Sequence, residues 1–177
     1  MKICVYGSAI DTIPTPYLEA AKKLGEILAQ KGHTTIFGGG NHGVMGYLAR
    51  GVVANKGELI GIAPKFFDKS DILFPECTSF IFTETMRERK HKMEELADAF
   101  IVAPGGIGTF EEFFETYTLR QLEQHTKPII LLNIDGYYDH LISTIDRAVK
   151  ENFLTPKTRS LFEIFGTCEE AIAYLET

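Results

Sequence analysis

Short apolar segments that end in glycine recur along this chain, and each precedes a stretch of helical character. The segment at residues 2–6 runs into Gly7, the segment at residues 34–37 runs into three glycines, and the segment at residues 99–103 runs into PGGIG. Their length and composition are typical of buried strands. Strands that alternate with helices favour a parallel sheet that is covered by helices on both faces.

Extending this pattern along the chain predicts the order of the elements. Strands are expected at residues 2–6, 34–37, 58–63, 79–82, 99–103, 128–132 and 161–165. Helices are expected from an N-cap at Thr15 to Gly32, at 44–55, from Thr85, from Thr109, at 137–151 and at 167–177. The 177 residues contain no linker and no repeat. They predict one domain, residues 1–177, with a Rossmann-like, doubly wound α/β fold.

Composition narrows the classes of partner. A net charge of −6 argues against non-specific binding to nucleic acid or to an anionic membrane. The three cysteines are scattered and form no CxxC pair, which argues for a reducing compartment and against a zinc site. No apolar run approaches the roughly 18 residues of a membrane-spanning helix, and the first residues do not form a secretory leader. We expect a cytoplasmic protein with no metal and no cofactor.

Three of the predicted strands end in glycine-rich or small-residue turns. These turns lie at residues 7–9, 38–40 and 104–108. The carboxyl ends of parallel strands share one edge of the sheet, which is where ligands of such sheets bind. We therefore expect Gly7, Ser8, Gly39 and Gly40 to line a binding crevice together with the PGGIG turn (residues 104–108).

The sequence PGGIGTFEE at residues 104–112 carries the strongest local signal. Glycines let the backbone approach a ligand closely, and a helix N-terminus attracts anions such as phosphate. Thr109 and Glu112 have the spacing of a capping box, so Thr109 is predicted to begin a helix. Glu112 either closes that helix end only or also takes part in a site, for which the neighbouring Glu111 argues. The spacing matches neither a P-loop nor GxGxxG.

The segment MRERKHKM at residues 86–93 carries a second signal. Thr85 and Glu88 form a capping box, which predicts a helix start. At helical spacing Arg89 and Lys90 fall on the apolar face, between two methionines. Two interpretations are open: these cations meet a ligand anion, or they pair with carboxylates of the chain or extend to the rim of the apolar face.

The helix after the PGGIG turn has apolar residues on two sides. Four aromatic residues share one stripe, which predicts packing in the core: Phe110, Phe113, Phe114 and Tyr117. Leu119 and Leu122 lie well around the helix from this stripe. A helix that is apolar on two sides is often buried on two sides, so we expect a subunit interface here.

Together, the two motifs resemble the signature of the Lonely Guy (LOG) family, PGGxGTxxE with an upstream M-x-x-R-K helix. Members of this family are often labelled as similar to lysine decarboxylases. This chain has PGGIGTFEE at 104–112 and MRERK at 86–90. The resemblance covers most of the chain, since ICVYGS (3–8), FGGGNHGVMG (37–46) and NIDGYYD (133–139) also match family stretches.

The resemblance implies a homodimer with active sites at the subunit interface. It implies phosphoribohydrolase activity, in which a nucleoside 5′-monophosphate is split into a free base and ribose 5-phosphate. In plants and many microbes that base is an N6-substituted adenine, a cytokinin. By matching positions, Arg89 and Glu112 are the implied catalytic pair. The implied substrate-binding residues are Asp71, Lys90, Gly105, Gly106, Ile107, Gly108, Thr109, Phe110, Glu111 and Thr118.

Some questions stay open at the level of sequence. The segment IAPKFFDKSDILF at residues 62–74 departs from the family's usual V-I-P-K-x-L stretch, which leaves the preferred base undecided. Relatives of this fold serve as molybdenum-cofactor carriers, so the alternative is a carrier that binds a nucleotide or a pterin cofactor without turnover. A lysine decarboxylase is rejected, because that chemistry needs a pyridoxal phosphate Schiff base and a far larger apparatus.

Overall fold

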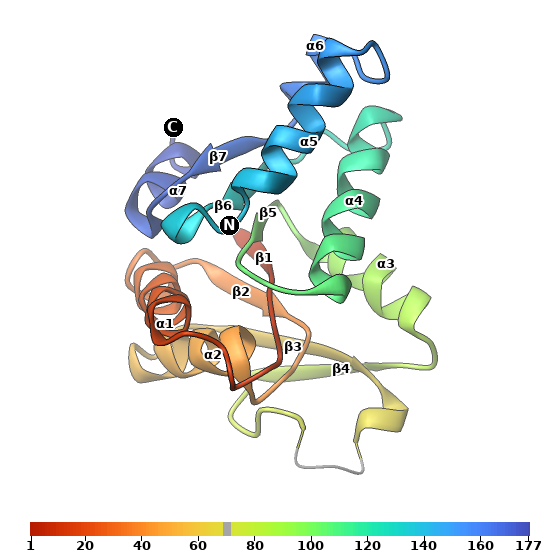
Figure 1. Cartoon of the computed structure of the whole chain (residues 1–177). Helices are drawn as coiled ribbons and strands as arrows, with labels where there is room; N and C mark the ends of the chain where they lie inside the picture. Colours follow the sequence, from red (N-terminus) through yellow and green to blue (C-terminus); the bar gives the residue numbers. More distant parts are fainter. Residues whose placement is uncertain (69–71) are drawn as a thin grey trace.

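The computed structural model describes residues 1–68 and 72–177. They form a seven-stranded parallel sheet with the strand order β4-β3-β2-β1-β5-β6-β7 (Figure 1). The strands are β1 (Lys2–Tyr6), β2 (Thr34–Phe37), β3 (Leu59–Pro64), β4 (Ser79–Thr83), β5 (Ala99–Val102), β6 (Ile129–Leu132) and β7 (Glu163–Phe165). The helices are α1 (Thr15–Gln30), α2 (Gly43–Ala54), α3 (Met86–Leu96), α4 (Ile107–Gln121), α5 (Asp139–Lys150), α6 (Pro156–Arg159) and α7 (Cys168–Leu175), with short 3₁₀ helices η1 (Lys65–Phe67) and η2 (Ile134–Gly136).

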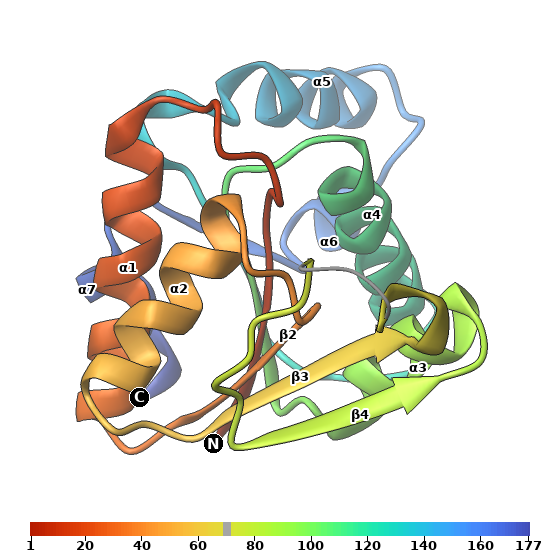
Figure 2. The same ribbon diagram turned by 90° about the horizontal axis from the view of Figure 1, so that it is seen from below.

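Helices cover both faces of the sheet, as the sequence predicted. Helices α1, α2 and α7 lie on one face, and α3, α4 and α5 lie on the other (Figures 1 and 2). Strand β1 supplies both cores because successive side chains of a strand point to opposite faces. Ile3 and Val5 join the core under α1, α2 and α7, whereas Cys4 and Tyr6 join the core under α3, α4 and α5. The Rossmann-like, doubly wound α/β prediction is confirmed.

Strand β1 is the point at which the direction of winding changes. Its neighbours are β2, through Val5 opposite Phe37, and β5, through Tyr6 opposite Val102. The chain builds outward from β1 to β4 on one side and from β5 to β7 on the other. Such a switch point opens a crevice at the carboxyl ends of the strands. The turns after β1, β2 and β5 all lie at this edge, as expected from their glycines.

The helix starts confirm some capping predictions and correct others. Thr85 and Thr167 cap α3 and α7 with their side chains, which accept from the N–H groups of Glu88 and Glu170. The prediction that Thr109 caps α4 was wrong, because α4 begins two residues earlier at Ile107, with Gly106 at the cap position. The prediction for Thr15 was also off by one residue, since Pro14 occupies the cap position of α1.

The aromatic stripe of α4 is only partly a core feature. Phe113 and Tyr117 are buried and pack against Phe162. Phe114 is 41% exposed, so its assignment to the core was wrong. Successive residues of a helix are about 100° apart, which turns Phe114 away from the sheet when Phe113 faces it. Leu122, just beyond the end of α4, is also exposed.

Across the two described ranges, none of the helices has the length and apolar character needed to cross a membrane.

Candidate active site

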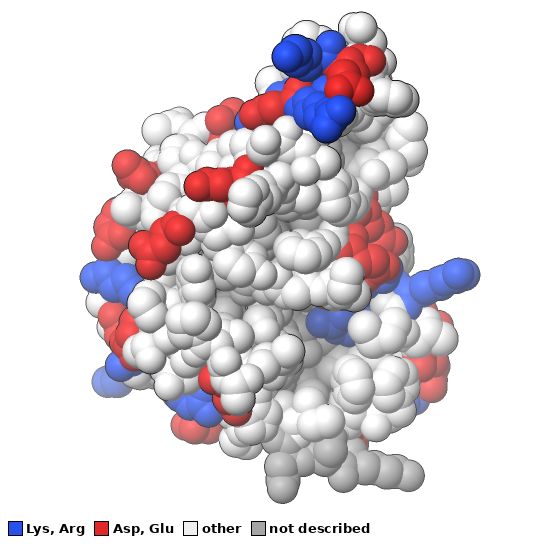
Figure 3. All heavy atoms as spheres, in the orientation of Figure 1, with Lys and Arg blue, Asp and Glu red and all other residues white. Residues whose placement is uncertain are grey.

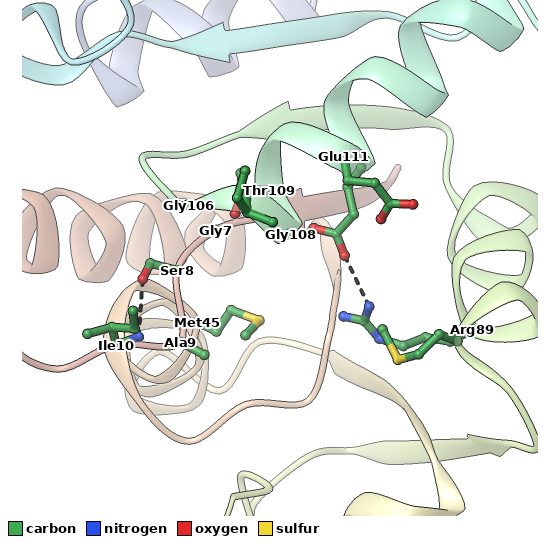
Figure 4. Close-up of a pocket in the computed structure, with 13 residues that line it drawn as sticks. Gly7, Ser8, Ala9, Ile10, Met45, Arg89, Gly106, Gly108, Thr109 and Glu111 are labelled. Atoms are coloured by element: carbon green, nitrogen blue, oxygen red, sulfur yellow. Dashed lines mark hydrogen bonds and ion pairs between the residues drawn. The ribbon is translucent and has the colours of Figure 1, made fainter.

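A cavity of about 300 Å³ lies at the carboxyl edge of the sheet, where the turns after β1 and β5 meet α2, α3 and α4 (Figure 4). The predicted residues that line it are Gly7, Ser8, Arg89, Gly106, Ile107, Gly108, Thr109, Glu111 and Glu112. Ala9, which belongs to the predicted small-residue turn at residues 7–9, also lines it. Three further lining residues were not predicted, namely Ile10, Met45 and Met86. Met45 and Met86 lie within the stretches FGGGNHGVMG and MRERK that match the family, so the resemblance could have identified them as lining residues.

Arg89 and Glu112 form a buried ion pair at one side of this cavity. Nη1 of Arg89 donates to Oε1 of Glu112 at 3.1 Å (Figure 4). Nε of Arg89 donates to the carbonyl of Ile62 at 3.1 Å. The two residues are only 7% and 9% exposed. A buried charge is tolerated when it is paired and hydrogen-bonded. The pairing of α3 with α4 thus fixes both side chains at the cavity wall.

The guanidinium of Arg89 has room beside the turn after β2 because residue 38 is glycine. A Cβ added to Gly38 would lie 2.1 Å from Nη2 of Arg89. Sequence reasoning placed Gly38 in a glycine turn but not among the site residues. Its role is to leave space for a side chain from another element, which the glycine content of the turn alone did not reveal.

The carboxyl of Glu112 has an unusual environment. Burial raises the pKa of Glu112 above its ordinary value, and the charge and hydrogen bond of Arg89 only partly oppose this effect. Desolvation disfavours the ionised form of a carboxyl, whereas a nearby cation favours it. A carboxyl with a raised pKa exchanges its proton closer to neutral pH, which suits a general acid or base.

The N-terminus of α4 forms another wall of the cavity. Gly106, Ile107 and Gly108 are exposed there, and within the described part of the chain no side chain caps the helix. The N–H groups of the first helical turn therefore remain available to an anion, which the helix dipole also favours. Thr109 is buried, and its Oγ1 would lie 2.1 Å from a Cβ on Gly105, so glycine is needed for this packing.

Lys90 lies beside the cavity and does not line it. Its Nζ pairs with Glu111 and, at 2.6 Å, with Oε2 of Glu115. Burial would lower the pKa of Lys90, but the interactions with these two carboxylates raise it overall. In the space-filling view, acidic atoms over α4 face basic atoms that lie in a hollow below them (Figure 3). Of the two interpretations left open, pairing with carboxylates of the chain applies to both Arg89 and Lys90, while Arg89 also faces the cavity.

The second glycine turn shapes the cavity indirectly. Gly39 has φ of +78°, and a Cβ there would lie 2.5 Å from the ring of Phe80. A Cβ on Gly40 would lie 2.8 Å from Cε of Met45, which does line the cavity. These glycines therefore leave space for the side chain of Met45, which lines the cavity, and for the ring of Phe80.

Three further predicted residues, Gly105, Phe110 and Thr118, lie outside this cavity. Gly105 lines a neighbouring hollow with Tyr17 and Tyr137. Phe110 is half-buried and packs edge-to-face on Tyr138. Thr118 lies in a separate shallow groove on α4. Asp71 lies outside the described residues.

Comparison with known proteins gives independent evidence of the family to which this chain is related. The family model described as "Possible lysine decarboxylase" matches residues 45–175. The chain is 37% identical over 175 residues to the cytokinin riboside 5′-monophosphate phosphoribohydrolase LOG2 of Arabidopsis thaliana, a match that covers 99% of this chain and 82% of that protein. It is likewise 37% identical to the enzyme LOG of Oryza sativa, over 99% of this chain and 72% of that protein.

Solved structures give a consistent picture of the fold. A molybdenum cofactor binding protein from Rippkaea orientalis superposes with a TM-score of 0.77 at 25% identity, over 99% of this chain and 94% of that chain. The molybdenum cofactor carrier protein of Chlamydomonas reinhardtii shares the fold with a TM-score of 0.75 at 20% identity, over 99% and 95% of the two chains. The extent and identity of the matches to the plant proteins show that this chain belongs to the Lonely Guy (LOG) family.

Proposed function

We propose that this protein is a phosphoribohydrolase that cleaves the N-glycosidic bond of a nucleoside 5′-monophosphate. The products are the free base and ribose 5-phosphate, and the base is adenine or an N6-substituted adenine. The plant relatives carry this activity in their names. The observation that carries the proposal is the buried Arg89–Glu112 pair, which shares one cavity with the uncapped N-terminus of α4.

The 5′-phosphate binds at the start of α4 in this proposal. The N–H groups of Gly106, Ile107 and Gly108 and the hydroxyl of Thr109 supply donors at the positive end of a helix. Binding energy from this non-reacting group helps to hold the ribose in line with the catalytic pair. Arg89, which contacts Glu112, lies at the opposite side of the cavity from Ser8 and Ile10 (Figure 4). Gly106 and Thr109 lie between these two sides.

The reaction replaces the bond from C1′ to the base with a bond from C1′ to a water oxygen. The base leaves with the bonding electrons and takes up a proton, while the water loses one. Positive charge builds on the ribose as the bond breaks, as in glycoside hydrolysis. The Glu112 carboxylate stabilises that charge or accepts the proton of the water. Arg89 holds Glu112 in place and reaches the substrate from the same side.

Lys90 acts mainly through Glu111 in this proposal. Glu111 lines the cavity, and the ion pair with Lys90 fixes its direction. A carboxylate in this position accepts hydrogen bonds from the ribose hydroxyls. Phe110 and Thr118 lie outside the cavity and take no part in the chemistry of this proposal.

We further propose that the exposed face of α4 is covered by a second copy of the chain. Phe114 on this helix is 41% exposed, Leu122 just beyond its end is 61% exposed, and Ile107 at its start is 83% exposed. Burying such side chains contributes roughly 25 cal/mol per Å² of apolar surface. Light scattering during gel filtration is expected to give a dimer, and Phe114→Asp is expected to give a monomer. A monomeric unmodified protein rejects this part of the proposal.

Within cells we place the protein in the cytoplasm.

The test of activity is a chromatographic assay for free base. The purified protein is incubated with AMP and, separately, with isopentenyl-AMP, in the presence of EDTA. Free base from isopentenyl-AMP supports a phosphoribohydrolase that needs no metal, and the ratio of the two rates gives the preference for the prenyl group. Absence of free base from both nucleotides rejects the proposal for adenine nucleotides.

The likeness to the Rippkaea orientalis molybdenum cofactor binding protein favours one other function, a carrier of a nucleotide or a pterin cofactor. A carrier binds its cargo without turnover. A nucleotide that binds tightly and is recovered intact after hours would support the carrier. The buried Arg89–Glu112 pair favours the hydrolase, because it places a carboxyl and a cation together in the cavity wall, where a bound nucleotide would meet them.

A further inference from the structure

The segment NIDGYYD at residues 133–139 is a matched motif that the proposed chemistry leaves unused. It follows β6 and turns sharply at Gly136, whose φ is +72°. Asn133 holds the turn together, because its Oδ1 accepts from the N–H of Tyr138 at 2.7 Å and its Nδ2 donates to Asp139 at 2.8 Å. These hydrogen bonds fix the backbone that carries the adjacent side chains of Tyr137 and Tyr138.

Both tyrosine hydroxyls reach the backbone of the PGGIG turn. Oη of Tyr137 donates to the carbonyl of Gly105 at 2.6 Å, and Oη of Tyr138 donates to the carbonyl of Ala103 at 2.7 Å. The carbonyl between them, that of Pro104, accepts from the N–H of Ser8 at 3.3 Å. Three consecutive carbonyl oxygens are thus held by donors, so none of them is free to turn toward an anion.

The geometry of a trans peptide links these contacts to the anion site. The C=O and N–H of one peptide unit point in opposite directions, and the described part of the chain has no cis peptide bond. Holding the carbonyl of Gly105 on the side of Tyr137 therefore aims the N–H of Gly106 away from that side. Tyr137 lines the neighbouring hollow of about 230 Å³, whereas Arg89 lines the cavity, and Gly106 borders both.

The two rings are themselves restrained. Tyr138 is only 1% exposed, and Tyr137 packs edge-to-face on Tyr17 with ring centroids 5.4 Å apart. Burial raises the pKa of both hydroxyls, so both stay protonated and able to donate. The arrangement has the rigidity that a positioning role requires.

We propose that Tyr137 and Tyr138 are positioning residues that hold the PGGIG turn with its N–H groups toward the ligand phosphate. This inference rests on the phosphate site of the proposed function. It predicts that losing a tyrosine hydroxyl weakens recognition of the phosphate and spares recognition of the base. A residue that merely stabilised the fold would weaken both.

The test measures binding without turnover. Ribose 5-phosphate and free adenine are titrated separately, by calorimetry, into the wild type, Tyr137→Phe and the control Tyr174→Phe. Tyr174 lies on α7 and has the same 39% exposure as Tyr137. We expect Tyr137→Phe to raise the Kd for ribose 5-phosphate about fivefold, which is the effect of losing one hydrogen bond. Its Kd for adenine and both Kd values of Tyr174→Phe are expected to stay within about twofold.

Kinetics provide a second readout. With a nucleoside 5′-monophosphate that the wild type cleaves, Tyr137→Phe is expected to raise KM by a similar factor and to change kcat by less than about twofold. Tyr138→Phe is expected to show the same selective loss with a larger drop in Tm, because its hydroxyl is buried. Tyr138→Phe replaces Tyr137→Phe in the comparison if Tyr137→Phe does not fold.

Several outcomes overturn the inference. They are unchanged affinity of Tyr137→Phe for ribose 5-phosphate, equal losses for ribose 5-phosphate and adenine, and absence of ribose 5-phosphate binding to the wild type. The titrations do not depend on turnover. If the wild type cleaves no nucleotide but the selective loss is observed, the proposed function fails and the positioning role stands. If cleavage occurs without the selective loss, only the positioning role fails.

Discussion

Helices α3 and α4 meet at the site, and their N-termini differ in the way their backbone donors are used. At α3 the side chain of Thr85 accepts from the N–H of Glu88 at 3.1 Å, and the Glu88 carboxylate accepts from the N–H of Glu84 at 2.8 Å. At α4, glycine occupies the cap position and no side chain among the described residues caps the helix. The first end is closed by its own residues, whereas the second is left open for a ligand.

A threonine and a glutamate at the same spacing serve two purposes in these two helices. Thr85 and Glu88 lie at the start of α3 and satisfy local donors. Thr109 and Glu112 lie inside α4, where Thr109 packs on Gly105 and Glu112 faces Arg89 of α3. An earlier helix start, which the glycines permit, moves the same pattern from a capping role to the cavity wall.

The largest effect is expected from Glu112→Gln. Removal of the carboxylate is expected to lower kcat/KM about a thousandfold, which is typical for loss of an acid–base group, and to preserve the circular dichroism spectrum. The matched control is Glu88→Gln at the equivalent place in the α3 pattern, which we expect to keep at least half of the activity. Similar activity in the two glutamine variants would remove the distinction between the two helices.

The next effect is expected from Gly38→Ala, which perturbs the cation that faces Glu112. The added Cβ would lie 2.1 Å from Nη2 of Arg89, so the guanidinium must move. We expect activity to fall about a hundredfold and the free energy of unfolding to fall by about 1–3 kcal/mol, as for other overpacked sites. Gly166→Ala is the control, since a Cβ added there meets no atom of residues 1–68 and 72–177 within 4 Å. Retention of full activity in Gly38→Ala would show that the position of Arg89 is not critical.

A smaller effect is expected from giving α4 the kind of cap that α3 has. Gly106 has φ of −97°, and among the described residues no atom is found within 4 Å of an added Cβ, so Gly106→Asp is sterically allowed. Its carboxylate is expected to accept from the N–H groups of the first turn and to repel the phosphate, which raises KM for the nucleotide about tenfold. Gly106→Ala separates the effect of the cap from the loss of glycine. If Gly106→Asp and Gly106→Ala have equal KM values, the open end is not the phosphate site.

The smallest effect on activity is expected from Thr85→Ala, which opens the end of α3. Loss of this cap is expected to lower the free energy of unfolding by about 1 kcal/mol. Thermal and urea denaturation measure this change, and KM for the nucleotide is expected to stay within about twofold. A large rise in KM would mean that the cap of α3 also supports the ligand site.

The alternation of strands and helices could be predicted from the sequence, because segment length, apolar runs and glycine turns are local properties. It also placed three glycine turns at one edge, since parallel strands present their carboxyl ends together. Within this frame Arg89 and Glu112 could be chosen as candidates from residue type and from the resemblance to a family.

The way in which those residues come into contact depends on the tertiary structure and could not be predicted from local sequence patterns. The start of α4 depends on the conformation of Gly106, and the pair of Arg89 with Glu112 spans 23 residues along the chain. The space beside Gly38 and the contact of Tyr137 with Gly105 depend on how separate elements pack. Local sequence patterns set the faces of each helix and strand, but the rotation of one element against another follows from side-chain packing across the whole core.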